Sequence, residues 1–128
     1  MIGGDRMFRD IKGMDRILDV NPQFGWNDIK YLERFEYFID LNDYGEEVSY
    51  FKALFKMKLN ENSLGKVWIK FNEVNNLKMN SIGGKYNQIM GFEVIDQLSL
   101  GWEQEQRYVV REYENGTLEF FCKSIEIL

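Results

Sequence analysis

The sequence predicts an α+β fold that is mostly antiparallel β, with one helix near the N-terminus. Three observations lead to this prediction. Residues 107–127 hold two runs rich in Val, Phe, Tyr and Ile, separated by an Asn-Gly dipeptide typical of a β-hairpin turn. Residues 51–59 alternate apolar side chains with lysines, as half-buried strands do. Residues 5–20 instead space their apolar side chains at the helical period.

The N-terminal segment, residues 1–25, is the helical part of this prediction. Gly13 weakens such a helix by up to ~1 kcal/mol relative to alanine. Asn21 precedes Pro22 and therefore avoids the α region, so we expect the helix to end there. The apolar positions that define the helical face are Met7, Phe8, Ile11, Met14, Ile17 and Leu18.

Residues 30–128 form the antiparallel β part, for which the pattern indicates about six strands. Alternation or short apolar runs mark strands at 31–41, 51–59, 67–72, 77–79 and 89–95, followed by the final hairpin. Apolar side chains occupy both faces of the last strand, so we expect that strand to be central or covered on both sides. The pattern leaves open whether the strands form a single sheet or a sandwich.

The register of the final hairpin follows from its charges. A two-residue loop would place Glu112 opposite Glu119, and like charges directly across two strands are destabilising. A three-residue loop at 114–116, with glycine in the left-handed position, places Arg111 opposite Glu119 instead. We therefore predict the three-residue loop. The same register pairs Val110 with Phe120 and Tyr108 with Cys122.

The composition indicates a single packed domain, residues 1–128, which we expect in the cytoplasm. Hydrophobic residues make up 45% of the chain, enough for a core, yet no apolar run reaches the ~18 residues of a membrane helix. The first residues lack the apolar stretch of a secretory signal. Cys122, the one cysteine in the sequence, has no partner for an internal disulfide, which fits a reducing compartment. We expect no membrane association.

The charge of the chain favours a basic partner over nucleic acid. The net charge is −5, from 16 basic and 21 acidic residues, whereas phosphate recognition needs clustered lysine and arginine. Residues 87–128 contain eight acids and three bases, which accounts for the whole imbalance. An acidic surface steers a basic partner, although solubility is the simpler interpretation of charge alone. We expect no nucleic-acid binding.

Histidine is absent from the sequence, which removes most catalytic and metal-binding sets of side chains. Ser-His-Asp and Cys-His catalysis and the usual zinc and iron ligand sets are excluded. Carboxylate pairs remain, because Glu103 with Glu105, or Glu112 with Glu114, would share one face of a strand as a glycosidase pair requires. Such pairs are also common on solvated strands. We therefore predict no enzyme activity, no catalytic residues, no metal and no cofactor.

Trp102, beside two acids, is the candidate anchor for a protein partner. An exposed tryptophan next to acids fits a binding hot spot, whereas the core is the usual place for a single tryptophan. The predicted partner-binding residues are Trp102, Glu103, Glu105, Glu112 and Glu114.

Three stretches resemble small bacterial immunity-type proteins of toxin–immunity systems. Residues 67–79 contain a Phe-x-x-Val-x-x-Leu element after a strand, and residues 91–96 read Gly-Phe-Glu-Val-Ile-Asp. Residues 112–127 contain an aromatic-Cys strand that ends in Ile-Glu-Ile. The resemblance covers residues 30–128. It implies a compact single domain that is encoded beside a toxin, binds that toxin and blocks it.

These observations lead us to expect a non-enzymatic protein-binding domain, an immunity-type inhibitor that occludes a basic toxin domain. Two rivals stay open. A carboxylate-based ligand-binding protein or enzyme would show carboxylates that converge inside a deep pocket. A homodimeric structural domain would bury an apolar patch across a two-fold axis.

Overall fold

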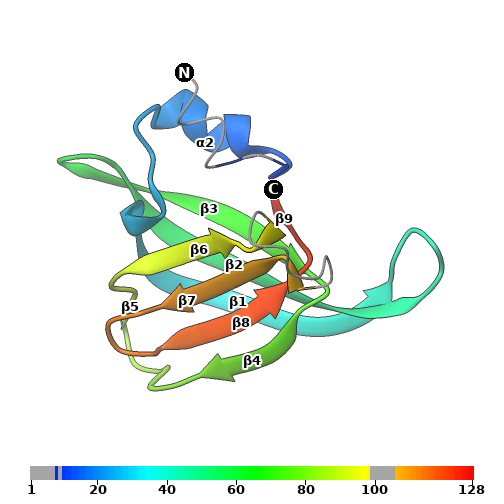
Figure 1. The fold of residues 1–128 in the computed structure, drawn as a ribbon. Helices are drawn as coiled ribbons and strands as arrows, with labels where there is room; N and C mark the ends of the chain where they lie inside the picture. Colours follow the sequence, from blue (N-terminus) through cyan, green and yellow to red (C-terminus); the bar gives the residue numbers. More distant parts are fainter. Residues whose placement is uncertain (1–7, 9, 99–105) are drawn as a thin grey trace.

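The structure is a computed structural model that describes residue 8 and residues 10–98 and 106–128, and it confirms the predicted fold class. Two antiparallel sheets, of five and four strands, lie against each other with the core between them (Figure 1). The strands therefore form two sheets and not one. No helix in the described part of the chain has the length and apolar character needed to cross a membrane.

The larger sheet is built on a long hairpin. Its strands, in spatial order, are β5 (Asn87–Gln88), β1 (Ile29–Leu41), β2 (Glu47–Asn60), β3 (Ser63–Asn72) and β9 (Ser124–Ile127). β2 follows the predicted alternation, so Phe51, Ala53, Phe55 and Met57 face the core and the lysines lie on the opposite face. β5 is only two residues long and pairs with Tyr31 and Leu32 of β1. Most of β1 therefore lies beyond the reach of β5.

The smaller sheet takes its strands from the second half of the chain. In spatial order they are β4 (Asn75–Met79), β8 (Leu118–Cys122), β7 (Tyr108–Glu112) and β6 (Phe92–Asp96). The predicted last strand, 117–127, is divided at Lys123, whose backbone N–H donates to the carbonyl of Asn72 at 2.9 Å. The first part belongs to this sheet and the second part crosses to the larger one. This crossing explains why both faces of the segment are apolar.

The predicted register of the final hairpin is confirmed. Arg111 lies opposite Glu119, and Val110 and Tyr108 lie opposite Phe120 and Cys122. Gly116 has a φ of 66°, in the left-handed region as predicted. The connection between the two strands runs from residue 113 to 117 and is therefore longer than the predicted three residues.

Glycines mark two places where an element begins later than predicted. Helix α2 (Met14–Val20) starts after Gly13, whose φ is 80° and where a Cβ would collide with the carbonyl of Ile127. The prediction of helix over 5–20 is thus wrong for residues 10–13. The strand predicted at 89–95 starts only after Gly91, because its φ of 73° interrupts the extended backbone. The ring of Tyr113 lies directly over Gly91.

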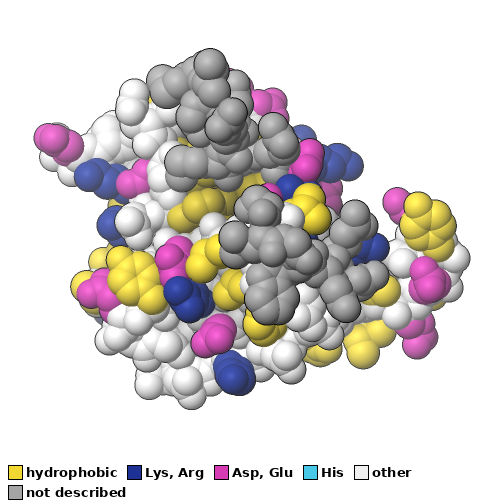
Figure 2. All heavy atoms as spheres, in the orientation of Figure 1, with side chains coloured by type: hydrophobic (Ala, Val, Ile, Leu, Met, Phe, Trp, Pro, Cys, Tyr) yellow, Lys and Arg dark blue, Asp and Glu magenta, His cyan; other side chains and the backbone are white. Residues whose placement is uncertain are grey.

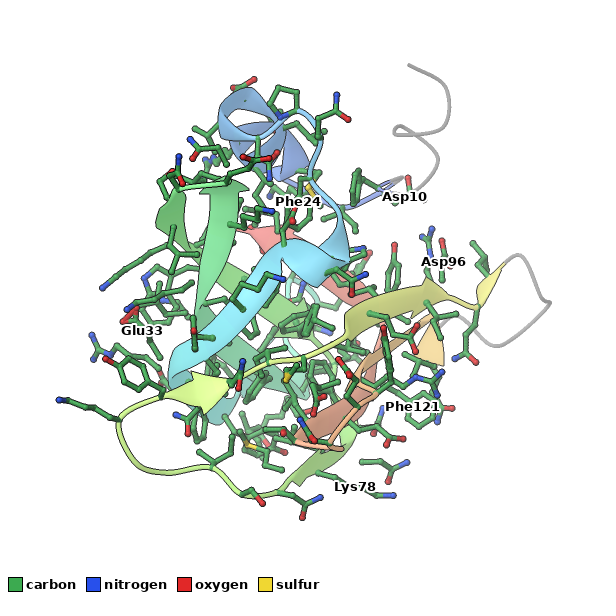
Figure 3. The ribbon with its side chains drawn as sticks, turned by 90° about the vertical axis from the view of Figure 1, so that its left-hand side faces the viewer. Asp10, Phe24, Glu33, Lys78, Asp96 and Phe121 are labelled. Atoms are coloured by element: carbon green, nitrogen blue, oxygen red, sulfur yellow. The ribbon has the colours of Figure 1, made fainter. Side chains whose placement is uncertain are left out.

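Aromatic side chains join the two sheets. The ring of Phe120 on β8 lies 5.4 Å from that of Phe51 and 4.9 Å from that of Phe71. Phe55 and Phe92 make a second contact between the sheets, at 5.4 Å. Near the helix, Phe24 and the short 3-10 helix η1 (Trp26–Asp28) close one end of the core (Figure 3). Such buried rings contribute about 1.5–3 kcal/mol each by removal of apolar area from water.

Candidate protein-binding site

The five predicted partner-binding residues fall into two groups. Trp102, Glu103 and Glu105 lie outside the described residues, so their roles stay predictions. Glu112 is the last residue of β7, and Glu114 lies in the turn that follows. The structure therefore tests the surroundings of these last two side chains only.

Glu112 is enclosed by the turn that it precedes. Its side chain is 1% exposed, and its carboxylate accepts hydrogen bonds from the backbone N–H groups of Glu114, Asn115 and Thr117 at 2.9–3.0 Å. Burial alone would raise the pKa of this carboxyl, but those N–H groups hold the pKa below its ordinary value. Glu112 thus organises the turn, while Glu114 alone of this pair is exposed.

Three other described acids of residues 87–128 form ion pairs within the chain. Glu93 forms an ion pair with Arg111, and Glu126 forms one with Lys12 at 3.7 Å. Arg107 lies between Asp96 and Asp10, with distances of 2.8 and 3.0 Å to their carboxylates (Figure 3). The acidic surface that the residue count suggests is therefore smaller in the folded chain.

A second acidic region projects from the larger sheet. We call residues 35–47, the far end of β1 and the turn that leads into β2, the arm. In Figure 1 the β1–β2 hairpin extends well beyond the smaller sheet. Residues 35–51 contain five acids and no lysine or arginine. None of these acids forms an ion pair with a described lysine or arginine.

The arm carries a row of exposed apolar side chains along one face. Phe35, Tyr37, Ile39 and Leu41 are 45–62% exposed and alternate along β1. Phe35 and Tyr37 lie opposite Ala53 and Phe51, both fully buried, so the row continues the core-facing side of the sheet. Exposed apolar patches of this kind mark interaction surfaces more often than scattered single residues do.

The edge of β1 in the arm is open. The pairing of β5 with β1 stops at Leu32, and no other described strand pairs with that side of β1. Sheet edges are normally shortened, bulged or protected by lysine or proline. The bulges of β1 lie before Phe35, and residues 35–41 contain neither lysine nor proline. This edge therefore lacks those devices.

The tip of the arm is held by its own turn. The side-chain oxygen of Asn42 accepts hydrogen bonds from the backbone N–H groups of Tyr44 and Glu46, at 2.9 and 3.0 Å. Gly45, with a φ of 77°, completes the turn. Tyr44 is 87% exposed at the tip, and Figure 2 shows acidic and hydrophobic side chains together on this projection. The tip presents an aromatic ring among Asp43, Glu46 and Glu47.

The outer face of the larger sheet has a different character. Trp68 points away from Val67 and Ile69, as its position in the strand predicts, and lies half-buried there. The ammonium group of Lys52 lies 4.9 Å from the centre of its ring, and that of Lys70 lies 4.4 Å from the ring of Tyr50. These cation–π contacts occupy the aromatic faces. On this face Lys52 and Lys56 of β2 lie opposite Lys70 and Lys66 of β3, as fits a solvated surface.

The cysteine lies in the core, and metal-ligating groups are not brought together in the described ranges. Cys122 is fully buried, and burial raises the pKa of its thiol, as expected for a core cysteine. No group of three or more acids or cysteines in the described ranges is placed to hold a metal ion.

The arm is the feature that the sequence did not lead us to expect as a binding surface. No protein-family model, curated protein or solved structure matches this chain.

Proposed function

We propose that this chain is a non-catalytic protein-binding domain, an immunity-type inhibitor that binds a cognate protein toxin and occludes it. The observation that carries the proposal is the tip of the arm, where the exposed ring of Tyr44 lies among acids that form no ion pair with a described lysine or arginine. Aromatic anchors surrounded by polar side chains dominate the energetics of many interfaces. Acidic side chains select a basic partner and speed its encounter.

Occlusion follows from the shape and charge of the arm. A toxin that acts on a negatively charged substrate needs a basic cleft, and the tip with Asp43, Glu46 and Glu47 is complementary to such a cleft. The hydrogen bonds of Asn42 already fix the turn, so little conformational entropy is lost when the tip is ordered in a complex. A rigid hairpin of this kind blocks substrate without any chemistry of its own.

The experiment is co-expression with the protein encoded by the adjacent reading frame, followed by titration calorimetry of the pair. We expect the wild type to restore growth, and reversal of the tip charges (D43K/E46K/E47K) to weaken binding by at least tenfold, a change of about 1.4 kcal/mol. The matched control reverses the same number of charges at the other predicted surface (E103K/E105K/E114K). We expect that control to change affinity by less than about threefold.

Two results would overturn the proposal. One is an adjacent gene product that is not toxic, or whose toxicity this chain does not relieve. The other is the reverse pattern, in which the E103K/E105K/E114K variant loses binding and the tip variant retains it, since that places the interface at the predicted Trp102 surface. Circular dichroism of both variants checks that the substitutions leave the fold intact.

A further inference from the structure

We infer that two copies of this chain pair through the open edge of β1, as antiparallel strands related by a two-fold axis at Tyr37. The inference does not depend on the proposed inhibitor function, because it concerns the strand of the arm and not the acidic tip. Addition of a strand to an exposed sheet edge is a recurrent way for proteins to associate. The two five-stranded sheets would then continue into one another.

The backbone of the arm is oriented for such pairing. The N–H of Asn42 donates to the carbonyl of Glu46 at 2.8 Å, which makes Asn42 and Glu46 a hydrogen-bonded pair. Hydrogen-bonded and non-bonded pairs alternate along antiparallel strands, and β1 has no bulge between residues 34 and 41. The peptide groups of Phe35, Tyr37 and Ile39 therefore point away from β2. These are the groups that a second strand would meet.

The side chains favour one register. With the axis at Tyr37, Tyr37 meets its own copy and Phe35 meets Ile39 of the second chain, which joins the two apolar rows. On the other face, Arg34 of each copy lies opposite Asp40 of the other. Opposite charges directly across strands stabilise a pair, and aromatic or β-branched neighbours do so as well. Glu36 lies opposite Phe38 of the second copy, so a two-fold contact in this register places no like charges directly across the strands.

Neighbouring registers are poorer. An axis at Glu36 places that carboxylate opposite its own copy, and an axis at Phe38 places Glu36 opposite Asp40, so both contain like-charge pairs. An axis at Phe35 extends the pairing to Tyr31, which β5 already occupies. An axis at Ile39 needs the N–H of Leu41 in the pairs next to the axis, and this N–H donates to the Asp40 carboxylate at 2.8 Å. With the axis at Tyr37, Leu41 belongs only to the outermost pairs. Because Arg34 and Asp40 of one strand complement Asp40 and Arg34 of an identical strand, we infer a second copy of this chain as the partner of this edge.

The first test is the mass of the full chain in solution, by analytical ultracentrifugation across a concentration series. We expect the population to shift from the 15.3 kDa monomer to twice that mass. We expect R34D to raise the dimer dissociation constant by about tenfold or more, and the charge swap R34D/D40R to restore it to within about threefold of the wild type. Residues 34 and 40 are six positions apart on one extended strand, so their side chains do not meet within one copy. Rescue by the swap therefore requires contact between copies.

The second test fixes the register through cysteine cross-linking. Y37C should form an intermolecular disulfide under mild oxidation, because equivalent residues on the axis lie about 5.5 Å apart, within disulfide range. F35C is the matched control and should not cross-link, since its partner is Ile39, whereas F35C/I39C should. A chain that stays monomeric at about 100 µM, above the dissociation constants of typical weak dimers, overturns the inference. A dimer that cross-links through F35C but not Y37C also overturns it.

Discussion

Two hairpins carry acidic side chains near their turns, and the surroundings of these acids differ. In the β7–β8 hairpin, the carboxylate of Glu112 is buried among backbone N–H groups, and neighbouring acids are paired with Arg107 and Arg111. In the β1–β2 hairpin, the acids of the arm face solvent without described ion pairs, beside exposed apolar side chains. The described acids at the first hairpin are largely engaged within the fold, whereas those of the arm are exposed and form no described ion pair.

The largest contrast is expected between two phenylalanines. Phe120 of β8 is fully buried against Phe51 and Phe71, so Phe120→Ala should lower the free energy of unfolding by about 3–5 kcal/mol, through lost burial and the cavity that remains. Phe35 of the arm is 45% exposed, so Phe35→Ala should cost less than about 1 kcal/mol. Urea unfolding followed by tryptophan fluorescence measures both. Equal losses of unfolding free energy in the two variants would contradict the assignment of Phe120 to the core and Phe35 to an exposed surface.

The next effect concerns the buried carboxylate. Glu112→Gln removes the charged acceptor of backbone N–H groups, and we expect a loss of about 2–3 kcal/mol in the free energy of unfolding. Glu114→Gln, in the same turn but exposed, is the control and should change stability by less than about 0.5 kcal/mol. Urea unfolding of the two variants checks this. A small effect at both positions would mean that the turn closes without Glu112.

A smaller effect should appear on acidification. The pKa of Glu112 is below the ordinary 4.5 in the folded chain, so folding favours its charged form. Its stabilising contribution is present above the ordinary pKa and is lost as the pH falls through the lowered folded pKa. The stability difference between wild type and Glu112→Gln should therefore shrink below pH 4.5. A difference that stays constant from pH 7 to about pH 3 would contradict this linkage.

Much of the fold was predictable because local rules decided it. The lysines that alternate along residues 51–59 fixed the faces of β2, and the like-charge argument at Glu119 fixed the register of the final hairpin. Gly13 and Gly91 were harder, because each needs a left-handed backbone that only the neighbouring chain imposes. Their effect on element boundaries depends on contacts with Ile127 and Tyr113 that sequence spacing does not reveal.

The candidate site was less predictable for a physical reason. Alternation along Phe35, Tyr37, Ile39 and Leu41 indicates one apolar face, but whether that face is buried depends on how far the other sheet extends. The available signal was the length of the strand predicted at 31–41, which exceeds the about 5–6 residues of a typical strand; the structure extends it to 13 residues. For Glu112, the position of a residue before a turn does not show that its side chain folds back into that turn.

The most direct test of the central claim, that the arm is the binding surface, is amide hydrogen exchange of the full chain. Exchange is measured at low concentration, at high concentration and with the toxin. We predict slower exchange in residues 35–41 at high concentration and in residues 42–47 with the toxin, while residues 113–117 remain unchanged. Equal exchange of the arm under all three conditions would contradict the claim, as would protection confined to residues 113–117.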